Sequence, residues 1–87
     1  MGVIAVQITI KNFDQWRLVF DRVKPLRDKA GITNARVYRG ATNQNEVLVW
    51  NEASDDAKAR EAIDGPEIRS AMEEAGVMGP PRIHVIP

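Results

Sequence analysis

The sequence has 87 residues, the size of one domain, and its twelve basic residues balance its twelve acidic residues. Zero net charge without a basic block argues against nucleic acid as a partner. The absence of cysteine excludes disulfides, thiolate metal sites and a cysteine nucleophile. The longest apolar run, Val3–Val6, is too short to cross a bilayer, and no signal peptide is recognisable. We therefore expect a single domain over residues 1–87, located in the cytoplasm, without membrane contact.

The first third of the chain predicts a strand followed by a long helix. Residues Val3–Ile10 alternate between apolar and more polar side chains, as a strand with one apolar face does. From Phe13–Ala30 the apolar residues recur every three or four positions, which is typical of an amphipathic helix. Pro25 lies inside this pattern, so we expect a kink or short break near Arg22–Lys24. Gly31 is suited to end the helix in a left-handed conformation.

The middle of the chain predicts a β-hairpin. Ile32–Gly40 and Glu46–Ala53 have the composition of strands, and Ala41–Asn45 is rich in turn-forming residues. Both faces of the second strand are apolar, so alternation does not tell which face meets the helices. One face would carry Val47 and Val49, and the other Leu48 and Trp50.

The last third predicts two helical segments and a final strand. Ser54 or Asp55 fits the N-cap of the first segment, and Pro66 fits the first position of the second. The Gly-Pro-Pro run within Met78–Pro81 predicts an extended or turning connection. Arg82–Ile86 then reads as the last strand.

The order strand, helix, strand, strand, helix, strand predicts an α+β fold of the ferredoxin-like βαββαβ type. Such a fold has a four-stranded antiparallel sheet with its helices on one face. The strands here leave apolar residues on the other face, and exposed apolar patches usually mark an interface or a ligand groove. A domain of this size is also marginal alone. We therefore expect a homodimer that forms through the open sheet face and encloses space for a small molecule.

Three residues are candidates for acid–base and oxyanion roles. His84 is the only histidine, and its side chain is the natural proton carrier near neutral pH. Arg36 and Tyr38 lie two residues apart on one strand face, where they could hold a carboxylate, enolate or carbonyl oxygen. The alternatives are a surface histidine and an interface pair in which Arg36 binds a partner carboxylate such as Glu46 or Glu52.

Two further residues are candidates for substrate binding. Gln7 is polar within an apolar strand, so it could bind a ligand or the dimer mate. Trp50 could line a pocket or pack beneath a helix. Trp16, by contrast, falls in the apolar stripe of the first helix and is expected in the core. No spacing of histidines or carboxylates indicates a metal site.

Beyond these patterns, the chain resembles the dimeric α+β barrel superfamily, and within it the small antibiotic-biosynthesis-monooxygenase-like domains. The segments that carry the resemblance span nearly the whole chain: Phe13–Trp16, Pro25–Arg27, Ala30–Ile32, Val37–Arg39, Asn45–Val49, Pro66–Arg69, Ala71–Met72 and Ala75–Pro81. The superfamily also includes haem-degrading enzymes that use a histidine on a helix. His84 lies on the last strand, which argues against that activity.

The resemblance implies a cofactor-independent monooxygenase-like enzyme that acts on a small oxygenated aromatic or polyketide-like molecule in a homodimeric barrel. His84 would be the base, Arg36 and Tyr38 would hold the oxyanion, and Gln7 and Trp50 would contact the substrate. No flavin or metal would be needed, because the substrate supplies the electrons. The alternative is a non-catalytic dimeric module for ligand binding or interaction, favoured by the scarcity of acid–base groups.

Overall fold

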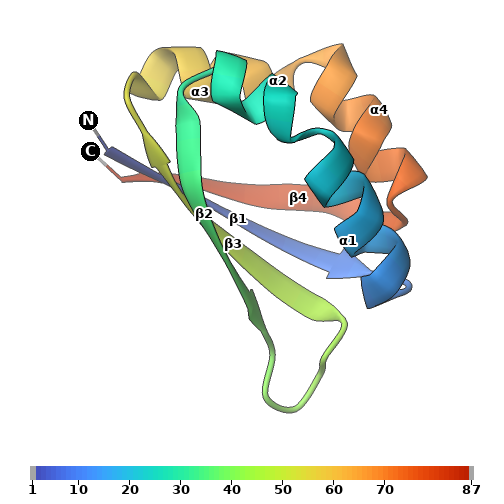
Figure 1. The fold of residues 1–87 in the computed structure, drawn as a ribbon. Helices are drawn as coiled ribbons and strands as arrows, with labels where there is room; N and C mark the ends of the chain where they lie inside the picture. The colour runs from blue at the N-terminus through green and yellow to red at the C-terminus, as the bar shows by residue number, and fades with distance from the viewer. Residues whose placement is uncertain (1, 87) are drawn as a thin grey trace.

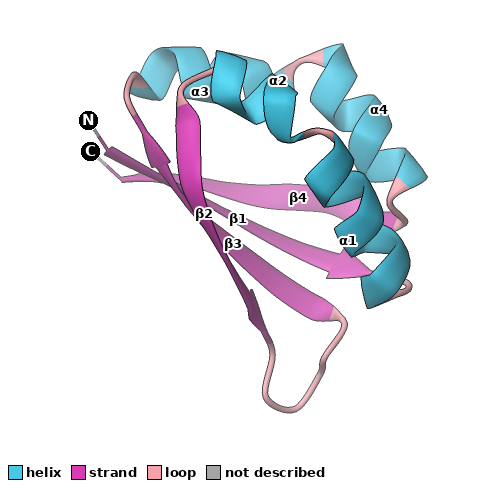
Figure 2. Cartoon of the chain, in the orientation of Figure 1, coloured by secondary structure: helices cyan, strands magenta, loops and turns pink. Residues whose placement is uncertain are grey.

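The computed structural model describes residues 2–86 and confirms the βαββαβ order, with each helical region divided into two helices (Figure 1). The elements in chain order are β1 (Gly2–Ile10), α1 (Phe13–Arg22), α2 (Lys24–Lys29), β2 (Ile32–Arg39), β3 (Glu46–Ala53), α3 (Asp56–Asp64), α4 (Pro66–Glu74) and β4 (Val77–Ile86). The strands form one antiparallel sheet in the order β2-β3-β1-β4. All four helices lie on one side of this sheet (Figure 2).

The break in the first helical region lies where Pro25 predicts it. Helix α1 ends at Arg22, Val23 separates the helices, and Pro25 occupies the first turn of α2. Proline is tolerated there because the first amides of a helix lack intrahelical partners. Gly31 follows with a φ of +73°, and a Cβ at this position would lie 2.2 Å from Ser54 Oγ. Glycine is therefore favoured at Gly31 by its left-handed backbone conformation, and a larger residue would also need the Ser54 hydroxyl to move.

The alternation along β1 and β3 determines which sheet face carries the core. The even-numbered residues of β1 and the odd-numbered residues of β3 are buried beneath the helices. These core-facing residues are Ile4, Val6, Ile8 and Ile10 on β1, and Val47, Val49, Asn51 and Ala53 on β3. Leu48 and Trp50 consequently lie on the opposite face. This resolves the ambiguity that the two apolar faces of β3 left in the sequence.

Two irregularities in the sheet were not predicted. The pairing of β2 with β3 shifts between Thr33 and Arg36, where Asn34 has a φ of +53°. The pairing of β1 with β4 shifts between Gln7 and Thr9, opposite the Gly-Pro-Pro run. Residues 78–81 are extended, which is one of the two predicted alternatives, but they are not a connection before the strand, because β4 already begins at Val77 and continues through them. Bulges of this kind bend a strand and increase its twist without ending it.

Candidate functional site

All five residues proposed for a site lie on the sheet face that carries no helix, which we call the open face. Directly opposed residues in antiparallel strands point to the same side of the sheet. Two rows of opposed residues cross the four strands on this side. One row is Tyr38, Leu48, Gln7 and Arg82, and the adjacent row is Arg36, Trp50, Ala5 and His84.

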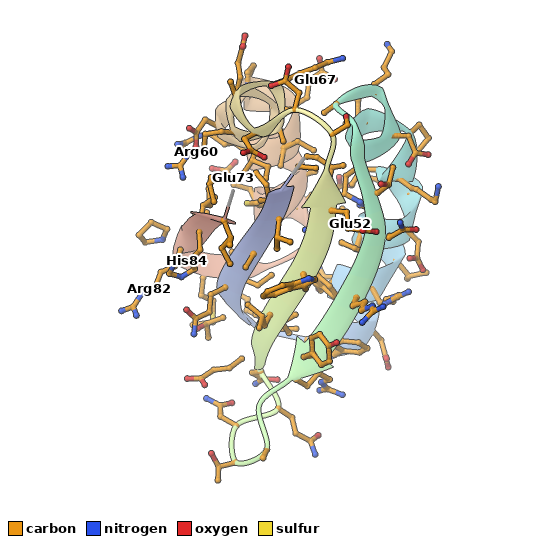
Figure 3. The ribbon with its side chains drawn as sticks, turned by 90° about the vertical axis from the view of Figure 1, so that its left-hand side faces the viewer. Glu52, Arg60, Glu67, Glu73, Arg82 and His84 are labelled. Atoms are coloured by element: carbon orange, nitrogen blue, oxygen red, sulfur yellow. The ribbon has the colours of Figure 1, made fainter. Side chains whose placement is uncertain are left out.

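The open face separates the predicted base from the predicted oxyanion-binding pair. Arg36 and Tyr38 lie on β2 at one edge of the sheet, and His84 lies on β4 at the other. Three strand spacings of about 4.8 Å put the backbones of these edge strands roughly 14 Å apart. Figure 3 shows His84 and Arg82 at the β4 edge of the sheet. Within one chain, therefore, His84 and the pair of Arg36 and Tyr38 lie at opposite edges of the open face.

Part of the proposed site does form a local group. Arg36, Tyr38 and Trp50 line a shallow groove together with Leu48. Tyr38 is 50% exposed and Trp50 37% exposed, so large aromatic surfaces face outward here. Trp50 thus lines a surface groove rather than packing beneath a helix. Gln7 is exposed in the row beside Leu48, on the central strand β1.

A second candidate site lies on the other side of the sheet, between the sheet and the helices. It is a partly open cavity of about 80 Å³. Its walls come from β1, β2, β3 and all four helices and are almost entirely apolar. Among the residues lining it are Val49, Trp16, Phe20, Ile68 and Met72. Concave, mainly apolar sites with a few convergent polar groups are the usual form of small-molecule sites.

Asn51 supplies a polar group to this cavity. Its side chain is 3% exposed, and its Nδ2 donates to the Ile4 carbonyl oxygen at 3.1 Å. Its Oδ1 is buried and has no hydrogen-bond partner within residues 2–86. Leaving a buried acceptor unpaired costs about 1–3 kcal/mol, so such an atom in a native structure requires an explanation. A donor from a bound molecule would satisfy the Asn51 oxygen.

Other kinds of site find no support in the described part of the chain. Over residues 2–86, no group of three or more His, Asp or Glu side chains is arranged to hold a metal ion. None of the helices in this range is long and apolar enough to span a membrane.

The fold belongs to a known class of small α+β domains. The chain matches the fold of antibiotic biosynthesis monooxygenases over its full length. One such structure, identified only as an antibiotic biosynthesis monooxygenase, has 12% sequence identity and a TM-score of 0.64, covering 100% of this chain and 97% of its own. No family model and no curated protein sequence matches the chain.

Within that class, the chain shares its fold with SnoaB, a cofactor-independent oxygenase from Streptomyces nogalater. An asparagine-to-alanine variant of SnoaB has 13% identity and a TM-score of 0.72, covering 99% of this chain and 90% of SnoaB. Rv0793 from Mycobacterium tuberculosis is similar at 15% identity and a TM-score of 0.66, covering 100% and 94% of the two chains. At these identities the likeness establishes the fold.

Sequence reasoning missed Asn51, although a signal for it exists. Asn51 is the polar exception in a series of buried residues that otherwise contains Val47, Val49 and Ala53. Alternation alone could not reveal this, because both faces of the strand are apolar. Once the face of Val47 and Val49 is known to meet the helices, Asn51, two positions further on, is the expected polar group beneath the helices.

Proposed function

We propose that this chain is a cofactor-independent oxygenase-like enzyme that binds a small hydroxylated aromatic in the cavity between the helices and the sheet. The observation that carries the proposal is the unpaired, buried Oδ1 of Asn51, a residue of the mainly apolar cavity wall. An aromatic ring suits the apolar walls, and a phenol or enol hydroxyl is the donor that the asparagine oxygen lacks. The fold shared with a cofactor-independent oxygenase supports the same class of reaction.

The proposed reaction requires the protein mainly to bind the substrate and to exclude water. Once its hydroxyl proton has passed to solvent, a phenol or enol can give electrons to dioxygen directly. In a polycyclic substrate that carries a saturated CH₂ beside the hydroxylated aromatic ring, this CH₂ becomes a carbonyl by gaining one oxygen atom, and its two hydrogens leave with the second oxygen atom as water. Asn51 would fix the position of the hydroxyl, and Trp16 and Phe20 would pack on the ring. Burial among apolar side chains would protect reactive intermediates from solvent.

Ligand size imposes one condition on the proposal. A rigid cavity of about 150 Å³ admits benzene, and the cavity here holds about 80 Å³. An aromatic ligand must therefore displace part of the wall. Met72 is half-buried at the wall and has three rotatable side-chain bonds, which makes it the residue best able to move aside.

Replacing Asn51 by leucine tests the proposal. Asn51→Leu removes the unpaired oxygen at similar volume, so we expect the free energy of unfolding to change by less than about 1.5 kcal/mol. The dissociation constant for p-cresol should rise about tenfold, and that for toluene, which lacks the hydroxyl, should not change. Oxygen uptake with hydroxylated aromatics of one to three rings should fall in the same variant. Equal p-cresol affinity in the two proteins would contradict the proposal.

A specific observation also favours the second candidate function, a binding module without catalysis. Within residues 2–86, no histidine or carboxylate lines the cavity, so no side chain there is an evident proton acceptor. If p-cresol binds through Asn51 and no hydroxylated aromatic causes oxygen uptake, the module is the correct function.

We further propose that two chains associate through the open face. This face exposes Tyr38, Trp50 and Ile86, which together present apolar surface of the kind that interfaces bury. In this arrangement the groove of Arg36, Tyr38, Leu48 and Trp50 lies at the contact between the chains. A shared catalytic role for His84, Arg36 and Tyr38 stays a prediction.

Trp50→Lys should convert the dimer to a monomer. A charged side chain in the middle of a buried interface costs several kcal/mol unless it is paired. Native mass spectrometry at micromolar concentration should show dimers for the wild type and monomers for the variant. Leu18→Lys is the matched control, because Leu18 is 74% exposed on α1, and it should remain dimeric. A monomeric wild type would contradict the proposed association.

A further inference from the structure

Arg27 is the charged residue among the described residues that line the same cavity. This residue lies on α2, is half-buried, and is among the residues that line the cavity. Its guanidinium carbon lies 3.7 Å from the centroid of the Phe20 ring, and its Nη1 donates to the Phe20 carbonyl oxygen at 2.6 Å. These two contacts hold the planar guanidinium in a defined position on the ring that forms part of the cavity wall.

The charge of Arg27 has no direct counterion in the described chain. The ion pairs within residues 2–86 involve other basic residues, namely Arg17, Arg22, Lys24 and Arg60. Burial lowers the pKa of Arg27, while the more distant carboxylates of Asp21 and Asp28 raise it. Arginine nevertheless stays protonated in proteins. Arg27 is partly desolvated and has no direct ion pair within residues 2–86, so an anion bound in the cavity would interact favourably with it.

We infer that Arg27 selects a ligand with an anionic group, specifically a carboxylate, in addition to the hydroxyl bound by Asn51. Arginine has five N–H donors in a rigid fork that matches the two oxygens of a carboxylate, and one of these donors is engaged by Phe20. The cavity would then recognise its ligand through two groups, the hydrogen-bond acceptor of Asn51 and the positive charge of Arg27. The inference rests on the proposed function, because it concerns the ligand of the same cavity.

The test compares aromatic acids with neutral analogues of the same shape. The probes are 3- and 4-hydroxybenzoate, matched with m- and p-cresol, in which a methyl group replaces the carboxylate. At pH 7 the carboxylates are ionised and the phenols are protonated. Trp16 lines the cavity, so its indole N–H resonance reports binding, and Trp50→Phe removes the other tryptophan signal from all proteins compared.

The variants are Arg27→Met and, as the matched control, Arg17→Met. Methionine keeps an unbranched apolar stem over Phe20 while it removes the charge. Arg17 also lies over the Phe20 ring, at 5.4 Å, but is exposed and does not line the cavity. We expect at least one hydroxybenzoate to bind about tenfold more tightly than its cresol, and Arg27→Met to abolish this preference. Arg17→Met should preserve it.

The outcomes separate this inference from the proposed function. If the cresols bind and the hydroxybenzoates bind no more tightly, the role of Arg27 is wrong and the aromatic site stands. The same conclusion follows if a preference for the acid survives in Arg27→Met. If none of the four probes shifts the Trp16 resonance, the aromatic site itself is wrong, and the role of Arg27 falls with it.

Discussion

Asn51→Asp should lower the free energy of unfolding by about 4 kcal/mol at pH 7. Burial disfavours the charged form of a carboxyl and can raise its pKa by about 3 units, each worth about 1.4 kcal/mol. Asn51 is 3% exposed, and the backbone groups that its Nδ2 contacts are unfavourable for an anion. The carbonyl oxygens of Ile4 and Val49 lie 3.1 Å and 3.5 Å from Asn51 Nδ2, where the variant would place a carboxylate oxygen.

The loss of stability in Asn51→Asp should depend on pH in a defined direction. Because the carboxyl pKa is raised in the folded state, the folded protein binds the proton more tightly than the unfolded chain does. The loss of stability is therefore complete above the raised folded-state pKa and shrinks as the pH falls toward about 3.9, the ordinary value for aspartate. Urea unfolding between pH 4 and pH 8 measures the effect.

A control at an exposed asparagine isolates the effect of burial. Asn45 lies in the exposed turn between β2 and β3, so Asn45→Asp should change the unfolding free energy by less than about 0.5 kcal/mol. If Asn51→Asp were equally harmless at pH 7, position 51 would have access to solvent. The cavity would then not be the dry, apolar environment on which the proposed binding mode depends.

Trp16→Ala is the second change for which we expect a large effect, a loss of about 3–5 kcal/mol of unfolding free energy. Trp16 is 3% exposed and stacks on Phe20 with ring centroids 4.8 Å apart. It also contacts Phe13 at a centroid distance of 5.6 Å. Truncation to alanine would remove the centre of this aromatic group and enlarge the cavity beside it.

The enlarged cavity provides a second measurement. Indole has the shape of the missing side chain, so millimolar indole should raise the melting temperature of Trp16→Ala by more than that of the wild type. Leu18→Ala, on the exposed side of α1, should cost less than about 0.5 kcal/mol. A stability loss below about 1 kcal/mol in Trp16→Ala would show that the space closes around the truncated side chain.

The sequence was sufficient to predict the fold because each local signal agreed with the others. The helical spacing from Phe13, the position of Pro25 and the left-handed Gly31 all predicted features that the structure contains. The bulges could not be predicted in the same way. Asn34 is a permissible but not obligatory residue for a positive φ, and a Gly-Pro-Pro run fits a connection as well as an irregular strand.

The same reasoning from the sequence predicted only part of the candidate site. Gln7, Arg36, Tyr38, Trp50 and His84 were found because polar and aromatic side chains in apolar strands stand out. Their shared face also follows from strand alternation once register is known. Their distance across the sheet depends on strand order, which places β2 and β4 at opposite edges. Asn51 on β3 and Arg27 on α2 line the same cavity, a proximity in space that no periodicity in the sequence records.

Strand β3 places its two most consequential side chains in adjacent positions, Trp50 toward the open face and Asn51 toward the cavity. Inserting or deleting one residue within this strand would exchange the two faces and leave a tryptophan where the asparagine belongs. The turn at residues 41–45 has no such restriction, since it lies outside the paired region. Natural variation in chain length among relatives of this protein is therefore expected to accumulate in that hairpin tip, while β3 keeps a constant length.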